Sequence, residues 1–137
     1  MDREYDIIVW GATGFTGRLV VDYMTEQHAN SNLKWAVGGR NPQKLQQMLA
    51  DRDVAMVTAD SGDEASIEAL VRRTRVILTT VGPYARYGSS LVAACAKHGT
   101  DYCDLTGEVH WMREMITAYQ EEAIATGARI VHTCGFD

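Results

Sequence analysis

Residues 11–17 read Gly-Ala-Thr-Gly-Phe-Thr-Gly, and this glycine-rich turn decides the fold. It directly follows the apolar run Tyr5–Trp10, which is typical of a strand covered on both faces. It directly precedes Phe15–Glu26, where apolar residues recur at helical spacing and charged residues take the other side. A strand, a glycine-rich turn and an amphipathic helix in this order predict the first unit of a dinucleotide-binding sheet.

Each glycine of the turn has its own expected role. Gly11 allows the tight turn, Gly14 lets the backbone approach a pyrophosphate, and Gly17 permits close packing of the helix on the strand. The backbone N–H groups at the helix start would meet the phosphate at the positive end of the helix dipole. The spacing is GxxGxxG instead of GxGxxG, and a tight turn without a ligand is the alternative interpretation. The residues expected to contact the cofactor here are Gly11, Thr13, Gly14, Phe15, Thr16 and Gly17.

Beyond the turn, short apolar runs alternate with segments of helical period. Further strands are expected at residues 34–38, 54–58, 76–81, 102–105 and 129–133. Helix starts are expected at Asn41-Pro42, within residues 61–63, at Ser89 or Ser90, and near Glu108. Strands that alternate with helices through short connections predict an α/β Rossmann fold. We expect a doubly wound parallel sheet of about six strands in the order 3-2-1-4-5-6, with helices on both faces, and one NAD(P)-binding domain over residues 1–137.

Composition excludes several classes of partner. The chain has 137 residues, of which 46% are hydrophobic and 23% charged, so it is long enough to bury a core without a disulfide or a metal. The formal net charge of -5 argues against nucleic acids and anionic membranes, which require a basic surface. No apolar stretch is long enough to span a bilayer. The charged amino-terminal residues lack the pattern of a signal peptide, which predicts a cytoplasmic protein.

The cysteines are expected to be free thiols. Cys95, Cys103 and Cys134 are odd in number and form neither a CxxC motif nor a Cys/His cluster at metal-binding spacing. The sequence therefore predicts no metal site.

The end of the second expected strand predicts which dinucleotide binds. NAD-binding domains usually place an acidic residue there to accept from the ribose 2′-OH, but residues 37–40 read Val-Gly-Gly-Arg. A guanidinium at Arg40 fits a 2′-phosphate, and Lys44 one helical turn later adds a second charge. The sequence therefore predicts NADP(H) in preference to NAD(H). A plain surface charge at Arg40 is the alternative.

Two further strand ends should contribute contacts, because doubly wound sheets bind ligands at the carboxyl ends of their strands. Asp60 is expected either to accept from the adenine amino group or to cap the next helix. The segment Val81, Gly82, Pro83 and Tyr84 is expected to line the nicotinamide ribose.

The sequence assigns no catalytic residue. His28, His98, His110 and His132 are scattered, and we expect them to be surface or packing residues. In hydride transfer the cofactor carries the chemistry, so a weak acid–base pattern is not evidence against it.

A few other side chains are expected near the ligand edge of the sheet. Asp104 and Glu108 lie there, with helix capping as the alternative for at least one of them. Cys134 either contacts substrate or is a buried thiol, the latter being favoured. Tyr84 either donates to a substrate carbonyl or forms a wall of the nicotinamide pocket.

An ordered set of motifs accompanies the glycine-rich turn. It consists of Gly39-Arg40, residues 81–84 (Val-Gly-Pro-Tyr), Tyr87-Gly88, residues 102–108 (Tyr-Cys-Asp-Leu-Thr-Gly-Glu) and residues 134–137 (Cys-Gly-Phe-Asp). The set resembles the saccharopine dehydrogenase-like oxidoreductases, in the branch that includes the trans-acting enoyl reductases. The resemblance covers nearly the whole chain. It implies an N-terminal NADP-binding Rossmann domain, followed by a substrate and dimerisation domain that lies outside this sequence.

The resemblance also implies an activity. It implies hydride transfer between nicotinamide and a small-molecule or lipid-linked substrate with a C=C or C=N bond, in a longer parent protein that forms homodimers. On its own the 137-residue chain is expected to be inactive. One alternative is a non-catalytic NADP(H) sensor or scaffold, since the fold hosts such functions. The other is an atypical short-chain dehydrogenase, but no tyrosine stands four residues before any lysine, as the Tyr-x-x-x-Lys pair of that class requires.

Overall fold

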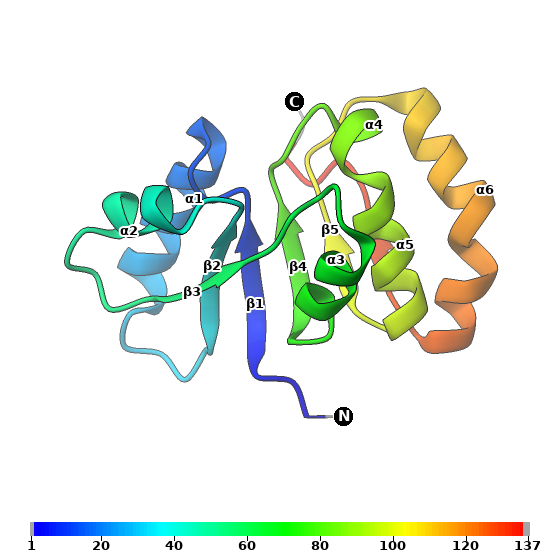
Figure 1. Ribbon diagram of the computed structural model, residues 1–137. Helices are drawn as coiled ribbons and strands as arrows, with labels where there is room; N and C mark the ends of the chain where they lie inside the picture. Colours follow the sequence, from blue (N-terminus) through cyan, green and yellow to red (C-terminus); the bar gives the residue numbers. More distant parts are fainter. Residues whose placement is uncertain (1, 136–137) are drawn as a thin grey trace.

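A computed structural model describes residues 2–135 and contains a parallel sheet of six strands (Figure 1). The strand order is β3-β2-β1-β4-β5-β6, which confirms the predicted order. The strands are β1 (Tyr5–Trp10), β2 (Trp35–Gly39), β3 (Ala55–Thr58), β4 (Thr74–Thr79), β5 (Asp101–Cys103) and β6 (Ile130–Val131). The helices are α1 (Phe15–His28), α2 (Pro42–Leu49), α3 (Glu64–Val71), α4 (Tyr84–Tyr87), α5 (Ser89–His98) and α6 (Val109–Thr126).

Helices cover both faces of the sheet, as Figure 1 shows. Successive residues of a strand point to opposite faces, so Ile8 and Val9 of β1 belong to two different cores. Val9 packs with residues of α1 and α2, including Val21 and Leu45. Ile8 packs with α3, α5 and α6. The strands are therefore apolar on both sides, which is why they read as continuous apolar runs in the sequence.

Two helix starts follow the expected capping chemistry. The Asn41 side chain accepts a hydrogen bond from the backbone N–H of Lys44, and Pro42 takes the first helical position of α2. Asp63 caps α3 by accepting from the N–H of Ala65. The alternative in which Asp60 caps this helix is therefore wrong.

The start of α5 was predicted incorrectly. Its N-cap is Gly88, with no side-chain cap, because the chain enters α5 directly from the short helix α4. The hydroxyl of Ser89 instead accepts from the indole N–H of Trp111 at 2.9 Å, and that of Ser90 donates to the carbonyl of Ser61 at 3.4 Å. At the other end of α5, Gly99 adopts the left-handed conformation expected of a helix stop.

The fourth and sixth strands also differ from the prediction. β4 begins two residues early, at Thr74, which is fully buried and pairs with Tyr5 of β1. Val81 lies beyond the strand, since the apolar run continues into the loop. β6 is only two residues long because the segment after it, His132 and Thr133, bonds to a carboxylate instead of a neighbouring strand.

The amino edge of the sheet is tied together by Arg3. Its guanidinium donates to the backbone carbonyls of Val71, Thr74 and His98 and to the hydroxyl of Thr100. These contacts lie at the opposite end of the strands from the glycine-rich turn. Among residues 2–135, no helix has both the length and the apolar character that crossing a membrane requires.

Candidate functional site

A cleft of about 650 Å³ lies over the carboxyl ends of strands β1 to β4. The chain leaves β1 for helices on one face of the sheet and leaves β4 for helices on the other, so this is the topological switch point where such sheets bind ligands. The lining residues are Trp10, Gly11, Thr13, Gly39, Arg40, Asp60, Ser61, Gly62, Val81, Arg86 and Tyr87.

The glycines of the turn have the environments that their expected roles require. Gly11 has a φ of +87°, and a Cβ there would lie 2.5 Å from Cγ2 of Val81. A Cβ on Gly17 would lie 2.0 Å from the carbonyl oxygen of Gly11, so only glycine allows α1 to approach the strand this closely. A Cβ on Gly14 would meet only an ordinary contact, 3.5 Å from the same oxygen. The protein therefore packs against the first and third glycines and leaves the approach to the middle one open.

The start of α1 is suited to a phosphate. Its N-cap is Gly14, and no side chain caps the helix. The helices α5 and α6 also lack a side-chain cap, whereas α2 and α3 have one. The first-turn N–H groups of α1 therefore retain hydrogen-bonding capacity at the positive end of the helix dipole. This arrangement fits a pyrophosphate.

The cleft carries more positive than negative charge. Arg40, at the end of β2, and Arg86, on α4, both line it, and neither forms an ion pair with a residue in the range 2–135. The carboxylate among the lining residues is that of Asp60, whose Oδ1 accepts from the N–H of Gly62 at 2.9 Å. Lys44 is exposed on α2 and does not line the cleft. Arg40 therefore lines the cleft at the end of β2, the position from which the sequence predicted it to bind a 2′-phosphate.

Five of the predicted contact residues line the cleft together: Gly11, Thr13, Arg40, Asp60 and Val81. The others of the turn form the start of α1 beside it, where the Phe15 side chain is 84% exposed. Gly82 and Pro83 do not line the cleft and follow Val81 in the loop towards α4.

Tyr84 belongs to the core and does not form a pocket wall. It is 4% exposed, and its hydroxyl donates to the carbonyl of Thr79 at 3.1 Å and accepts from the N–H of Leu105 at 3.4 Å. Burial raises the pKa of Tyr84 to about 12. With its proton held in this way, the hydroxyl has no free donor for a substrate carbonyl, so that interpretation is wrong.

Six residues that line the cleft were not among the predicted contacts: Trp10, Gly39, Ser61, Gly62, Arg86 and Tyr87. The first four flank strand ends that were already singled out, so strand position was an available signal. Arg86 and Tyr87 lie on α4, a helix of four residues, which is too short to show a periodic pattern in the sequence.

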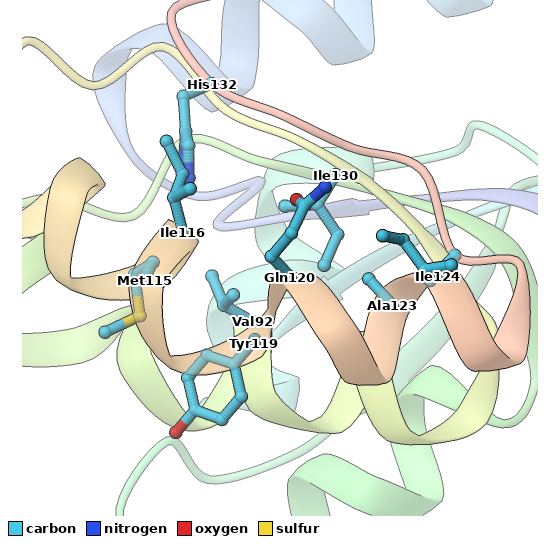
Figure 2. Close-up of a pocket in the computed structure, with 10 residues that line it drawn as sticks. Val92, Met115, Ile116, Tyr119, Gln120, Ala123, Ile124, Ile130 and His132 are labelled. Carbon is cyan, nitrogen blue, oxygen red and sulfur yellow. The ribbon is translucent and has the colours of Figure 1, made fainter.

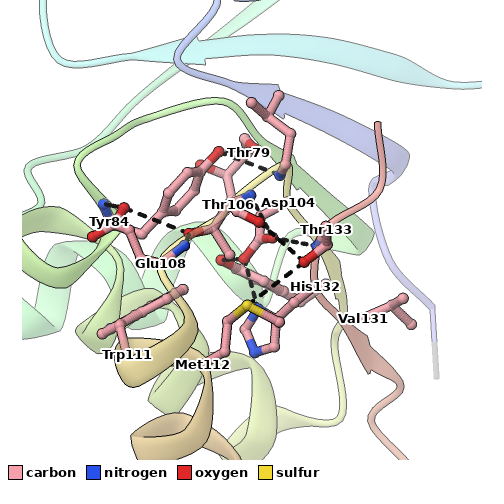
Figure 3. Close-up of polar contacts among 12 residues, drawn as sticks. Thr79, Tyr84, Asp104, Thr106, Glu108, Trp111, Met112, Val131, His132 and Thr133 are labelled. Carbon is pink, nitrogen blue, oxygen red and sulfur yellow. Dashed lines mark hydrogen bonds and ion pairs between the residues drawn. The ribbon is translucent and has the colours of Figure 1, made fainter. Parts of the chain in front are cut away.

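A buried carboxylate organises the ends of β5 and β6 (Figure 3). Oδ2 of Asp104 accepts from the Tyr102 hydroxyl at 2.6 Å and from Nδ1 of His132 at 2.7 Å. Oδ1 accepts from the backbone N–H groups of Thr106 at 3.1 Å and Thr133 at 3.0 Å. Burial alone would raise the pKa of Asp104, but the hydrogen bonds, led by those from His132 and Tyr102, outweigh burial and lower it. Asp104 therefore holds the chain together as an ionised acceptor.

Glu108 caps a helix other than its own. It stands before α6, but its carboxylate accepts from the N–H of Tyr84 at 2.6 Å and from the N–H of Ala85 at 3.0 Å, at the start of α4 (Figure 3). Capping was one of the two expectations for this residue. Cys134, which was expected to be buried, is exposed; Cys95 is buried, and all three cysteines are free thiols.

A second hollow lies between α5, α6 and β6 (Figure 2). Its lining is mainly apolar and includes Val92, Ile116 and Ile130. His132 also lines it, with a side chain that is 6% exposed, and its Nε2 has no hydrogen-bond partner among residues 2–135. No residue is shared between this hollow and the cleft, so the two are separate features.

Residues 7–131 match the family described as the saccharopine dehydrogenase NADP binding domain. The chain belongs to this family. The NADP-binding domain is 46% identical over 141 residues to the trans-acting enoyl reductase of Mycobacterium bovis, covering 99% of this chain and 33% of that protein. It is 48% identical over 141 residues to the trans-acting enoyl reductase of Mycobacterium ulcerans, covering 98% of this chain and 33% of that protein. It thus spans about a third of the length of these curated relatives.

Solved structures share the fold of this NADP-binding domain. Apo saccharopine dehydrogenase (L-Glu forming) from Saccharomyces cerevisiae superposes with a TM-score of 0.78 at 16% identity, over 96% of this chain and 27% of that one. Citrobacter sp. triphenylmethane reductase complexed with NADP(H) superposes with a TM-score of 0.69 at 19% identity, over 93% of this chain and 48% of that one. The family assignment confirms NADP(H) as the expected cofactor and the oxidoreductase class of the relatives.

Proposed function

We propose that this domain holds NADP(H) for hydride transfer in a longer oxidoreductase. The observation that carries the proposal is the cleft, which Arg40 lines without an ion-pair partner among residues 2–135. The uncapped start of α1 and the open approach to Gly14 lie beside it. These groups match the pyrophosphate and the 2′-phosphate of one dinucleotide.

Each part of the cofactor has residues suited to it. The first turn of α1, from Phe15 to Gly17, binds the pyrophosphate, and Arg40 binds the 2′-phosphate, with Lys44 adding long-range positive charge. Asp60 accepts from the adenine amino group. The loop of residues 81–83 adjoins the nicotinamide ribose. When bound, the nicotinamide supplies the hydride, and the domain supplies binding and orientation.

The substrate is a small or lipid-linked molecule with a C=C or C=N bond. The description of the relatives as enoyl reductases supports a C=C bond. Residues 1–137 form the cofactor domain in this proposal, and the groups that recognise substrate and pair subunits belong to the remaining two thirds of the relatives' length. The domain alone is therefore expected to bind NADPH without turnover. Oxidation of NADPH by the full-length parent would separate a reductase from a sensor or scaffold.

Replacing Arg40 tests the cofactor assignment. Arg40→Asp places a like charge at the 2′-phosphate and is expected to weaken NADPH binding more than tenfold, while NADH binding is retained. The measurement is a calorimetric titration of each cofactor into the 137-residue chain. Arg113→Asp, on the exposed surface of α6, is the control for the change in net charge. An unchanged preference for NADPH in Arg40→Asp would overturn the assignment.

A further inference from the structure

We infer that Arg86 binds the pyrophosphate of the dinucleotide from the wall of the cleft that faces the glycine-rich turn. The inference rests on the proposed function and adds a phosphate-binding residue outside the glycine-rich turn. Arg86 lines the same cleft as Gly11 and Thr13 but comes from α4, after the fourth strand.

The position of α4 places Arg86 across the cleft from the start of α1. Tyr84, at the beginning of α4, packs in the core formed with α3 and α5, whereas α1 packs on the other face of the sheet. Figure 1 accordingly shows α4 and α1 on different sides of the carboxyl edge. A pyrophosphate that binds the first turn of α1 lies between these two walls.

The guanidinium of Arg86 is prepared for an anion. It forms no ion pair within residues 2–135 and lies over the ring of Tyr87, with 5.3 Å between Cζ and the ring centroid. This contact with the ring uses none of the N–H groups as hydrogen-bond donors, so they remain available for the bidentate contact that phosphate oxygens accept.

The backbone beneath Arg86 is fixed at both ends of α4. The carboxylate of Glu108 accepts from the N–H groups of Tyr84 and Ala85. At the other end, a Cβ on Gly88 would lie 2.9 Å from Cζ2 of Trp111, which shows how closely α4 and α6 are packed. Glu108 is therefore a positioning residue, and it lowers the entropic cost of placing Arg86 at a ligand.

Sheet order separates Arg86 from Arg40. Arg40 follows β2, whereas α4 follows β4, and β1 lies between these strands. In the proposed arrangement the 2′-phosphate belongs to the side of Arg40, and the pyrophosphate belongs to the start of α1, which follows β1. Arg86 should therefore increase affinity for NADPH and NADH alike and leave the preference between them unchanged.

The test measures dissociation constants of NADPH and NADH for the 137-residue chain and its Arg86→Gln variant. We expect Arg86→Gln to weaken both cofactors by about tenfold and to the same extent, as for loss of a charge-assisted hydrogen bond. Arg113→Gln on α6 removes the same charge outside the cleft and should change neither. Arg86→Lys should recover part of the loss, and an unchanged thermal midpoint establishes that the variants are folded.

Two smaller ligands separate the phosphate sources. ADP-ribose has the pyrophosphate but no 2′-phosphate, and it should bind Arg86→Gln more weakly than wild type. 2′-AMP has the 2′-phosphate but no pyrophosphate, and it should bind both proteins equally. Equal affinities of wild type and Arg86→Gln for both cofactors would overturn the inference. A loss confined to NADPH and 2′-AMP would also overturn it, because it would place Arg86 at the 2′-phosphate. If the wild type binds neither cofactor, the proposed function fails first, and that result is distinct from a failure of Arg86.

Discussion

The two halves of the carboxyl edge use their polar groups in opposite ways. Over β1 and β2, α1 begins without a side-chain cap and Arg40 has no ion-pair partner among residues 2–135. Over β5 and β6, Asp104 accepts from two side chains and two backbone N–H groups. In the proposed function the first half keeps its hydrogen-bonding capacity for the cofactor, whereas Asp104 in the second half uses its own to fix the chain.

This difference supports the proposed assignment of cofactor contacts to Arg40 and the start of α1. A buried carboxylate is costly unless its hydrogen bonds are made, so the four hydrogen bonds of Asp104 account for a charged group in the core without any ligand. Arg40 is exposed and unpaired within the described residues, so packing does not explain it. Substitutions in the two halves should accordingly separate folding from binding.

The largest expected effect is at the third glycine of the turn. Gly17→Ala forces a Cβ to within 2.0 Å of the carbonyl oxygen of Gly11 and should lower the free energy of unfolding by about 3 kcal/mol or more. Denaturant titration of wild type and Gly17→Ala measures the difference in the free energy of unfolding. Gly14→Ala is the matched control, expected to change stability by less than about 1 kcal/mol while weakening NADPH binding. Equal stability losses in the two variants would contradict the distinction between packed and open glycines.

The next effect is at the buried carboxylate. Asp104→Asn replaces the ionised acceptor of Tyr102 and His132 and should lower the free energy of unfolding by about 2–3 kcal/mol at neutral pH. Asp22→Asn, which removes an exposed pairing with Arg52, should cost less than about 1 kcal/mol. The free energy of NADPH binding, measured under conditions where both variants are folded, should change far less than the free energy of unfolding does.

Acidification should remove the advantage of Asp104. The folded state lowers the pKa of this carboxyl below its unfolded value of about 3.9. Its contribution to stability is therefore complete above that value and is lost as the pH falls through the lower, folded-state pKa. The difference in unfolding free energy between wild type and Asp104→Asn should narrow below about pH 4. A difference that stays constant down to the acid transition would contradict an ionised Asp104.

The smallest effect is expected at Glu108, whose carboxylate caps the start of α4. Glu108→Ala removes the acceptor for the first N–H groups of α4 and should cost about 1 kcal/mol of stability. Glu108→Gln keeps one acceptor oxygen and should recover part of the loss. Glu114→Ala, exposed on α6, is the control. If Gln and Ala behave identically in stability and NADPH affinity, the carboxylate does not position α4.

The sequence predicted the sheet well because its central strands β1 and β2 are largely buried on both faces. Runs such as Tyr5–Trp10 have no solvent-facing side, and the alternation with helices leaves few topologies. The end of β4 was predicted too late because Val81 is apolar like a strand residue. Val81 instead lies in the loop, where it packs against the turn at Gly11. Hydrophobicity alone does not distinguish a strand from a loop that packs on it.

Site residues were predictable where their position follows from the neighbouring strand in the sequence. They were not predictable where contacts depend on how distant strands align. The glycine-rich turn and Arg40 stand next to strands, so their place at the cleft followed from sequence position. The pairing of Asp104 with His132, 28 residues later, depends on how β5 and β6 align. Tyr84 was misassigned because no periodic pattern predicted α4, the short helix that directs this ring into the core.

The Arg3 contacts at the amino edge have a practical consequence for experiments on this domain. β1 has six residues and spans roughly 20 Å, so a label or surface linker attached ahead of Arg3 lies that far from the cleft. Immobilisation through the amino-terminal side should therefore leave cofactor exchange unhindered. Shortening the chain past Arg3 would instead release three carbonyls and a hydroxyl at once, so a truncated domain would be a poor starting material for binding assays.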